Sequence, residues 1–569
     1  MAIWRDLSVR EAISKIKNQE IVLPVIQRRL VWEEDSMELL FDSLLKGNSF
    51  GSIICIEEER NTKPLFAFRQ FTPDGEMERS IERDELSKNH WFVIDGQQRL
   101  QSFYIGLCGS YHGKRLYFDL FSDFAHSEYD FKFAEQPDKL SKQNRERAET
   151  GLKDCLWCAV DALYDRLNQT RNSDQVAEEW IKKYGLEDHI QIRHVERNVR
   201  RFFEEIFSGS SIGISTVNIN RSLDDVENRQ MIVELFRRLN DGGTKLSSYD
   251  LAASMFKGFD YKMESYLDEI TREYSALGVD QDTFIKLILI LNDKPTKEMV
   301  DLTVEDAEYA TDNYERISKS LCAMRNFLKA SGHEKWFLST RKRSVIPLYF
   351  IVYHIFYSDI PTDRLGGMFD RFDTADKNFC SMKSWLQMSL MNRVFSRGCG
   401  WIPYRTGVRK IHAVMKAHKG GQFPKDDLLR VYKTHPLNSF SDCVTDDSLG
   451  SFDRDYLFYL LYNASSSFRA EDIDHIHPKS LLESRGYDYS EINTICNYQL
   501  LEAGTNRGEK NGRELYDWIS EYVEPENLSE YLRRHHIPDN PELWKSENYQ
   551  EFLRERTVLL IRTLRDAIS

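Results

Sequence analysis

One short stretch near the C-terminus, residues 472–480, contains two acids, two imidazoles and a proline within nine positions, as Asp-Ile-Asp-His-Ile-His-Pro-Lys-Ser. Two asparagines, Asn497 and Asn506, follow it. Hydrolysis of a phosphodiester with one metal ion needs a hard cation on oxygen ligands, a neutral imidazole that takes a proton from water, and a rigid frame. The stretch therefore predicts a metal-dependent centre that cleaves phosphodiesters.

Four side chains are assigned to this chemistry. Asp474 offers a carboxylate to the metal ion, and His475 offers the imidazole of a general base. The side-chain carbonyl of Asn506, brought back by a later turn and helix, can complete the ligand set. Asn497 is expected to act as a frame residue whose amide bridges the two arms of the site.

Two neighbours compete for these roles. His477 is the rival for the base and Asp472 the rival for the metal ligand. An adjacent Asp-His pair alone is weak evidence, because such pairs occur by chance in chains of this length. The combination with Pro478 and both asparagines is what makes the pattern specific. The period-two spacing of the apolar residues up to Pro478 predicts a strand that runs into a loop.

A second candidate site lies in the N-terminal half, where an apolar strand over residues 91–94 is expected to end in a glycine turn. Helical spacing of apolar residues follows the turn. A strand, a glycine turn and a helix N-terminus together form an anion site, and an arginine in the first helical turn can add a bidentate phosphate contact. A tight turn with its arginine in solvent is the alternative. The turn residues are Asp95, Gly96, Gln97, Gln98 and Arg99.

The bulk properties restrict the class of protein. A chain of 569 residues is expected to form three or four domains. No apolar run is long enough to span a bilayer and no signal peptide opens the chain, so a cytoplasmic protein without membrane contact is expected. Nine cysteines argue against a disulfide framework. Cys155 and Cys158 have metal-like spacing, but a pair of helical cysteines without metal is the favoured interpretation.

The net charge of −14 argues against a protein that coats DNA without specificity. It leaves room for a local basic groove, although each basic cluster is more simply a solvated helix face. The candidates for a groove are Arg341, Lys342, Arg343, Arg393, Arg397, Arg405, Arg409, Lys410 and Lys479.

Hydrophobic periodicity predicts an α+β protein that is mostly helical. Helices are expected over 7–17, 33–45 and 228–239, strands over 21–26, 51–56 and 212–219, and charged helices over most of 135–210. From residue 261 to about 395 the pattern is that of an all-helical bundle, and residues 398–403 have the composition of a domain boundary.

The C-terminal motif resembles the ββα-metal HNH nuclease motif, in a form close to that of the HNH domain of CRISPR effector nucleases. The resemblance rests on Asp474-His475-Ile-His-Pro478, then Asn497, then Asn506-Arg507-Gly508-Glu-Lys510. It implies that Asp474 and Asn506 bind Mg²⁺ or Mn²⁺, that His475 is the general base and that Asn497 is structural. One departure is the longer segment over residues 483–493 that precedes Asn497.

The N-terminal half is similar to the DGQQR domain of GmrSD-type proteins, a domain related to ParB-like nucleotide-binding folds. The residues that carry this resemblance include Gln27, Arg28, Arg29, Trp32, the turn at 95–99, and the stretch Phe236-Arg-Arg-Leu-Asn240-Asp-Gly-Gly243. It implies that a nucleoside triphosphate, whether GTP, ATP or CTP, binds at Asp95 to Arg99 with Gln27, Arg28 and Asn240, and that this domain is an NTPase.

Together the two resemblances imply an NTP-regulated, Mg²⁺-dependent DNA endonuclease of type IV restriction, acting on modified or foreign double-stranded DNA in antiphage defence. The expected domains are 1–260 (ParB-like sensor), 261–397 (helical linker) and 398–569 (HNH nuclease). A nucleotide-switched DNA-binding or partner-binding protein with a silent HNH fold is the alternative, and an NTPase with an auxiliary HNH domain is a third. A homodimer is compatible with the sequence.

Overall fold

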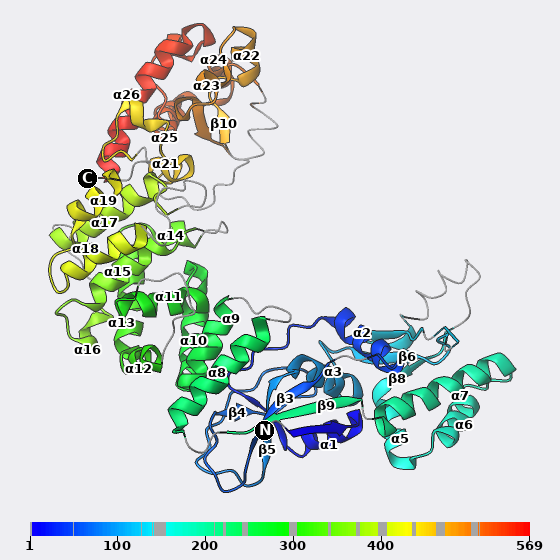
Figure 1. Ribbon diagram of the computed structural model, residues 1–569. Coiled ribbons are helices and arrows are strands. Elements are labelled where there is room, and N and C mark those ends of the chain that lie inside the picture. The colour runs from blue at the N-terminus through cyan, green and yellow to red at the C-terminus, as the bar shows by residue number, and fades with distance from the viewer. Residues whose placement is uncertain are drawn as a thin grey trace. The chain divides into compact units, whose positions relative to one another are not determined.

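The structure is a computed structural model of the 569-residue chain (Figure 1). It describes residues 3–48, 51–123, 125–126, 128–138, 140, 155–209, 211–219, 223–241, 248–294, 304–338, 343–370, 376–395, 407–434, 440–462, 473–501, 510 and 512–568. The chain forms two compact units, Met1–Ser265 with Leu302–Glu308 and Tyr266–Asp301 with Tyr309–Ser569. Helices and three small sheets make it an α+β protein that is mostly helical, as the sequence predicts.

A six-stranded mixed sheet forms the centre of the first unit, in the order β1-β9-β3-β5-β2-β4. The pairs β9–β3 and β5–β2 are parallel and the other three pairs are antiparallel. Parallel neighbours need long crossover connections, and the helices of this unit supply them. The strands are β1 (Ile3–Leu7), β2 (Ile21–Pro24), β3 (Ile53–Glu58), β4 (Phe68–Arg69), β5 (His90–Asp95) and β9 (Ile212–Val217).

Strand β1 differs from expectation, because the apolar spacing predicts a helix from residue 7. The structure ends the strand at Leu7 and begins α1 (Val9–Lys17) after Ser8. The Ser8 side chain accepts from the Glu11 amide while the Glu11 carboxylate accepts from the Ser8 amide, which is a capping box. Pairing of β1 with β9, more than 200 residues away, decides the strand.

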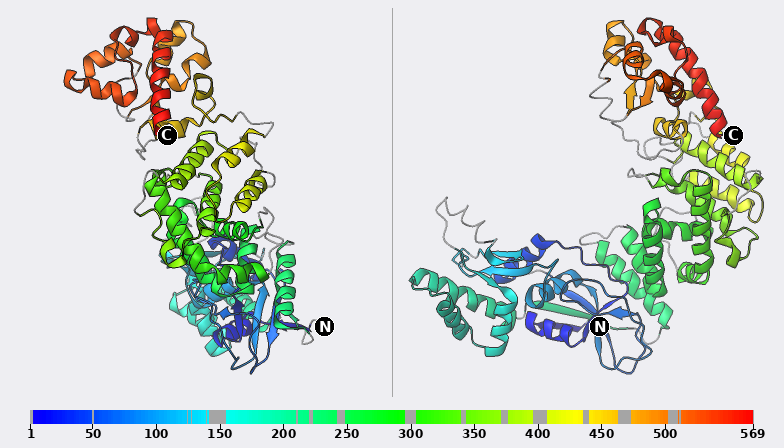
Figure 2. Two further views of the ribbon diagram at one scale, coloured as in Figure 1. Left: turned by 90° about the vertical axis from the view of Figure 1, so that its left-hand side faces the viewer. Right: turned by 180° about the vertical axis from the view of Figure 1, so that it is seen from behind.

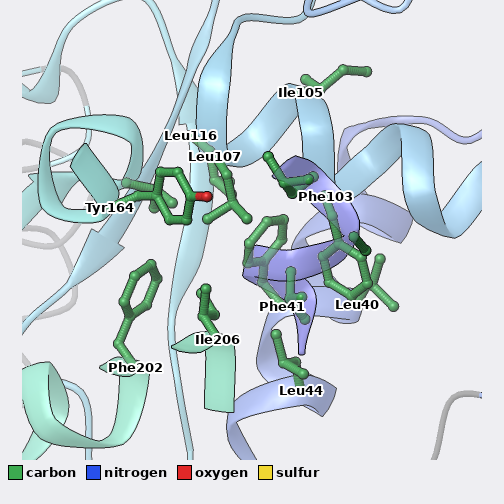
Figure 3. Close-up of a cluster of buried hydrophobic side chains, with 14 of the residues drawn as sticks. Leu40, Phe41, Leu44, Phe103, Ile105, Leu107, Leu116, Tyr164, Phe202 and Ile206 are labelled. Atoms are coloured by element: carbon green, nitrogen blue, oxygen red, sulfur yellow. The ribbon is translucent and has the colours of Figure 1, made fainter. Parts of the chain in front are cut away.

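Helices α1, α2 (Glu34–Leu45) and α3 (Gln97–Cys108) share one apolar core with the strands and with the following helical layer. Figure 3 shows Phe41 of α2 and Phe103 of α3 in this core, with ring centroids 5.5 Å apart in an edge-to-face arrangement. The same close-up places Phe202 and Ile206 of the later helices beside them. The core therefore joins segments that are far apart in the sequence.

A second, antiparallel sheet, β7-β6-β8, lies beside α5, α6 and α7 in the same unit (Figure 1). The prediction of helical cysteines at residues 155 and 158 is wrong for Cys158, which lies in strand β8. The Trp180 indole donates to its sulfur, and burial raises the pKa of this thiol to about 12. The elements are β6 (Arg115–Asp119), β7 (Phe131–Ala134), β8 (Trp157–Ala159), α5 (Val160–Thr170), α6 (Ser173–Lys183), α7 (His189–Phe203) and the π-helix η1 (Glu204–Ser208).

The region from residue 225 to residue 461 is helical throughout its described parts, in agreement with the sequence. The expected junction at 397/398 lies outside the described residues. The helices are α8 (Asp225–Asp241), α9 (Ser248–Phe259), α10 (Lys262–Tyr274), α11 (Gln281–Leu291), α12 (Val304–Asp312), α13 (Tyr314–Ala330), α14 (Glu334–Phe337), α15 (Ile346–Phe356), α16 (Thr362–Leu365), α17 (Lys377–Met391), α18 (Arg409–Ala417), α19 (Lys425–Lys433), α20 (Asp446–Leu449) and α21 (Arg454–Leu461).

The C-terminal part of the second unit surrounds a two-stranded hairpin with short helices and one long one. Figure 2 shows the long helix α26 in red beside the orange hairpin region. The elements are β10 (Ile473–His475), α22 (Lys479–Ser484), α23 (Tyr489–Ile492), the 3₁₀ turn η6 (Ile495–Asn497), β11 (Tyr498–Leu500), α24 (Leu515–Tyr522), α25 (Leu528–His535) and α26 (Tyr549–Ile568).

Arg556 of α26 is buried at the centre of this part. Its guanidinium donates to main-chain carbonyls on two sides: Ile495, Cys496 and Tyr498 around η6, and His535 and His536 at the end of α25. One side chain thus fixes the start of β11 to two helices. None of the described helices is both long enough and apolar enough to cross a membrane.

We expect Arg556→Met to lower the free energy of unfolding of the second unit by about 3–5 kcal/mol, because buried carbonyls lose charge-assisted hydrogen bonds. Thermal unfolding, combined with hydrogen exchange of residues 495–500, measures the effect. Arg562→Met, on an exposed position of the same helix, is the control and should be neutral. Equal stability of the two variants would contradict the role given to Arg556.

Candidate functional site

The hairpin β10–β11 positions the two side chains assigned to chemistry. Asp474 is paired with Gln499 and His475 with Tyr498 in an antiparallel register. Successive side chains of a strand leave it on opposite faces. Asp474 therefore meets the side chain of Gln499 on one face, and His475 meets the ring of Tyr498 on the other.

A buried lysine holds the Asp474 carboxylate. Nζ of Lys510 lies 2.5 Å from Oδ2 of Asp474 and also donates to the carbonyls of His475 and Ile476. Nε2 of Gln499 donates to the same carboxylate oxygen at 2.9 Å. Burial lowers the pKa of Lys510, and the Asp474 charge opposes that shift. Within the described part of the chain, Oδ1 of Asp474 accepts no hydrogen bond.

The tautomer of His475 follows from its hydrogen bond. Nε2 of His475 lies 3.1 Å from Oδ1 of Asn493. The orientation of the Asn493 amide is fixed, because its Nδ2 donates to the Tyr489 carbonyl and its Oδ1 accepts from the Tyr498 hydroxyl. An amide oxygen only accepts, so Nε2 carries the proton and Nδ1 presents a lone pair. Burial also lowers the pKa of His475, which favours the neutral ring.

Asn497 is fully buried and bridges the hairpin to the segment that follows β10. Its Oδ1 accepts from the amide of His477, and its Nδ2 donates to the carbonyls of His477 and Ile492. A buried polar side chain that satisfies three main-chain groups rigidifies its surroundings. This arrangement is what the frame role requires.

The rival base, His477, lies in the core. Its ring is buried and packs edge-on against Phe552 and Tyr549. Burial lowers the pKa of His477 to about 3, so the ring is neutral, and it has no access to solvent. His477 is therefore a packing residue.

The rival ligand Asp472 and the predicted ligand Asn506 lie outside the described residues. As predicted, the strand runs into a short loop, at residues 476–478, before α22 begins at Lys479.

The donor set of the hairpin fits a hard cation. Asp474 offers one carboxylate oxygen without a hydrogen-bond partner among the described residues. Mg²⁺ is commonly held by one or two carboxylates with the remaining positions filled by phosphate oxygens and water. No group of three or more His, Cys, Asp or Glu side chains suited to a metal ion occurs in the described part of the chain. A cation at Asp474 would therefore depend on substrate oxygens.

Three residues that support the site had no role in the sequence prediction: Lys510, Asn493 and Gln499. Lys510 follows Asn506 by four positions in the sequence. Asn493 lies at the end of the longer segment that departs from the HNH pattern. Gln499 is fully buried in β11. The roles of Lys510, Asn493 and Gln499 depend on contacts with Asp474 or His475, which are distant from them in the sequence.

The N-terminal turn has the expected strand–glycine–helix geometry. Strand β5 ends at Asp95, and Gly96 takes a left-handed conformation, with φ of 93°, before α3 begins at Gln97. A Cβ at Gly96 would lie 2.2 Å from Cδ1 of Ile53, so only glycine fits. Nη2 of Arg99 lies 3.2 Å from Oδ2 of Asp95. Burial lowers the pKa of Arg99, and Asp95 counteracts this.

The glutamines of this turn bind the chain itself. Nε2 of Gln97 donates to the Arg28 carbonyl, and Oε1 of Gln98 accepts from the amides of Val31 and Trp32. Gln27 donates to the carbonyls at the end of β5. These contacts bring Gln27 and the Arg28 carbonyl to the turn. Asn240 lies in the last turn of α8, and its side chain is outside the described residues.

Comparison with known proteins identifies the first unit. Residues 9–257 match the family described as GmrSD restriction endonuclease, N-terminal domain. The chain is also similar to an uncharacterized protein of Methanocaldococcus jannaschii, with 24% identity over 264 residues. That match covers 44% of this chain and 41% of the relative, so the chain spans less than half the length of the relative it matches.

We expect Asn497→Ala to lower the free energy of unfolding by about 2–4 kcal/mol, because the buried main-chain groups it serves are left unpaired. Faster hydrogen exchange over residues 476–482 should accompany a lower unfolding temperature. Asn527→Ala, at an exposed position without a side-chain cap hydrogen bond, is the control. Unchanged exchange at residues 476–482 would refute the bridging role.

Proposed function

We propose that this chain, whose residues 9–257 belong to the GmrSD restriction endonuclease family, is an NTP-regulated, Mg²⁺-dependent DNA endonuclease with its catalytic site at the hairpin β10–β11. The observation that carries the proposal is the pairing of an oriented imidazole with a carboxylate held by Lys510 and Gln499. A neutral histidine whose Nδ1 is free for a proton is the group that activation of water requires. The adjacent carboxylate supplies an oxygen ligand.

The geometry restricts how a phosphodiester would bind. Asp474 and His475 leave the strand on opposite faces, so a phosphate that meets both must lie across the strand rather than on one face. Nδ1 of His475 would take the proton of the attacking water, while Asn493 keeps the opposite nitrogen protonated. Bound Mg²⁺ or Mn²⁺ would stabilise the charge of the phosphate and of the leaving oxygen. Asp474, with Asn506, would hold the cation.

The first unit would supply regulation. Arg99 and Arg28 lie at a helix N-terminus, where oriented amides and the helix dipole attract phosphate. We infer that a nucleoside triphosphate, GTP, ATP or CTP, binds there and that this domain hydrolyses it, on a ParB-like fold. Restriction of modified phage DNA, in the manner of type IV systems, is the biological role that the family suggests.

A second function has one observation in its favour. The Lys510 ammonium occupies one oxygen of Asp474, an arrangement that also suits a protein whose HNH-like hairpin is silent and whose output is DNA or partner binding. Nicking of supercoiled plasmid distinguishes the two. Nicks that require Mg²⁺ or Mn²⁺ support the endonuclease, and binding without nicking under every nucleotide condition supports the silent form.

We expect His475→Ala to reduce cleavage of plasmid DNA by about 10²–10⁴-fold, because the general base is lost. Binding of DNA and the unfolding temperature should remain close to those of the unaltered protein. The assay should use plain, hydroxymethylated, glucosylated and phosphorothioate DNA, with and without each nucleotide. His418→Ala, at a partly exposed histidine of α18's C-terminal end, is the control. Cleavage by His475→Ala at the unaltered rate would remove His475 from the mechanism.

We expect Arg99→Ala to weaken nucleotide binding by about 10-fold or more, since a charge-assisted phosphate contact is lost. Calorimetric titration with GTP, ATP and CTP measures the effect, and circular dichroism checks the fold. Arg29→Ala is the control, because the Arg29 side chain is exposed and only its carbonyl contacts the turn. Equal affinity in both variants would place the nucleotide elsewhere.

A further inference from the structure

A cleft of about 540 Å³ lies next to His475 in the second unit. Its walls come from the end of α17, from α20 and α21, and from the segment between α23 and β11. Two lining residues, Asn493 and Tyr498, are those that contact the His475 imidazole. The cleft therefore leads directly to the base of the proposed reaction.

The arginines that line the cleft are more exposed than the aspartates that pair with them. Arg393 is paired with Asp453 and Arg454 with Asp455, so the formal charges balance. The exposed fractions of these side chains differ. The arginine side chains are 43% and 47% exposed, and the aspartate side chains are 21% and 17% exposed. Asp453 also caps α21 through the Tyr456 amide. All four side chains line the cleft, and the guanidiniums are more open to solvent than the carboxylates.

Aromatic surface completes the cleft. Tyr489 forms part of the wall and is 76% exposed, the most exposed of the large apolar or aromatic side chains in the described chain. Lys479 approaches the same ring, with Nζ 5.9 Å from its centroid. On the opposite wall Arg454 lies over the Tyr498 ring. Arginines that track a backbone and open aromatic rings that stack on bases are the chemistry of single-strand nucleic-acid binding.

We propose that this cleft binds the single DNA strand that flanks the scissile phosphate. Arg454 and Arg393 contact backbone phosphates, and Tyr489 stacks on a base. The inference rests on the proposed endonuclease function, which it deepens by naming the path of the strand. It also explains how a chain with a net charge of −14 would hold DNA: contact is confined to the exposed arginines of a local cleft beside the proposed base.

The test measures binding of a fluorescein-labelled single strand of about 12 thymidines. His475→Ala is the background in every protein, so that no cleavage occurs, and anisotropy is recorded over a range of salt concentrations. Arg454→Gln and Tyr489→Ala are the test changes. Arg554→Gln and Tyr516→Ala are the matched controls: Arg554 is exposed and pairs with Glu551, and Tyr516 is exposed beneath Lys545.

Arg454→Gln should weaken binding at least about fivefold and reduce the slope of log K against log salt by about 0.7, the loss of one phosphate contact on a single strand. Tyr489→Ala should weaken binding about tenfold with the slope unchanged, because stacking releases no counterions. In a protein that retains His475 and can therefore cleave, Arg454→Gln should raise KM for plasmid cleavage and leave kcat unchanged.

If Arg454→Gln and Tyr489→Ala show the same affinities and salt slopes as the controls, the cleft does not bind the strand and the proposal is overturned. Binding of the mononucleotide dTMP is measured in parallel. If the two variants bind dTMP more weakly but bind the strand as before, the cleft is a site for free nucleotide, and the proposal is overturned. The endonuclease proposal fails separately, if the protein with His475 never nicks plasmid. Weakened strand binding in the variants would then still support the cleft as a DNA-binding surface.

Discussion

Arg556 is buried, and its guanidinium donates hydrogen bonds to carbonyls before β11 and at the end of α25. The hairpin that carries Asp474 and His475 has strands of only three residues, too short to be stable alone. Its geometry therefore depends on what surrounds it. Arg556 holds the start of β11 from outside, and Asn497, directly before β11, binds the main chain of His477, which follows β10. The packed core of this region therefore sets the positions of Asp474 and His475.

The same dependence explains the buried lysine. An ammonium removed from water needs compensation, and Lys510 obtains it from the Asp474 carboxylate and two carbonyls of the hairpin. The contact orients the carboxylate and leaves its second oxygen open within the described structure. That oxygen is the one that the proposed mechanism would offer to a cation.

The first unit uses polar side chains in another way. Gln27, Gln97 and Gln98 are buried or half-buried amides that satisfy the main chain of residues 28–32 and the end of β5. The glutamines of the motif thus build the turn, and its arginine pairs with Asp95. In the second unit, the cleft beside His475 joins residues of α21, α23 and β11 that are separated in sequence. Both sites are assembled from short segments held by buried polar contacts.

The sequence by itself determined the mostly helical α+β class, the strand, turn and helix at residues 91–108, and the relation of the first unit to GmrSD proteins. These follow from local periodicity, glycine and a contiguous motif. Strands β1 and β8, the burial of His477, the tautomer set by Asn493 and the contact of Lys510 with Asp474 depended on the tertiary structure. Each is decided by partners from other segments, as in the pairing of β1 with β9, and no local pattern records such partners.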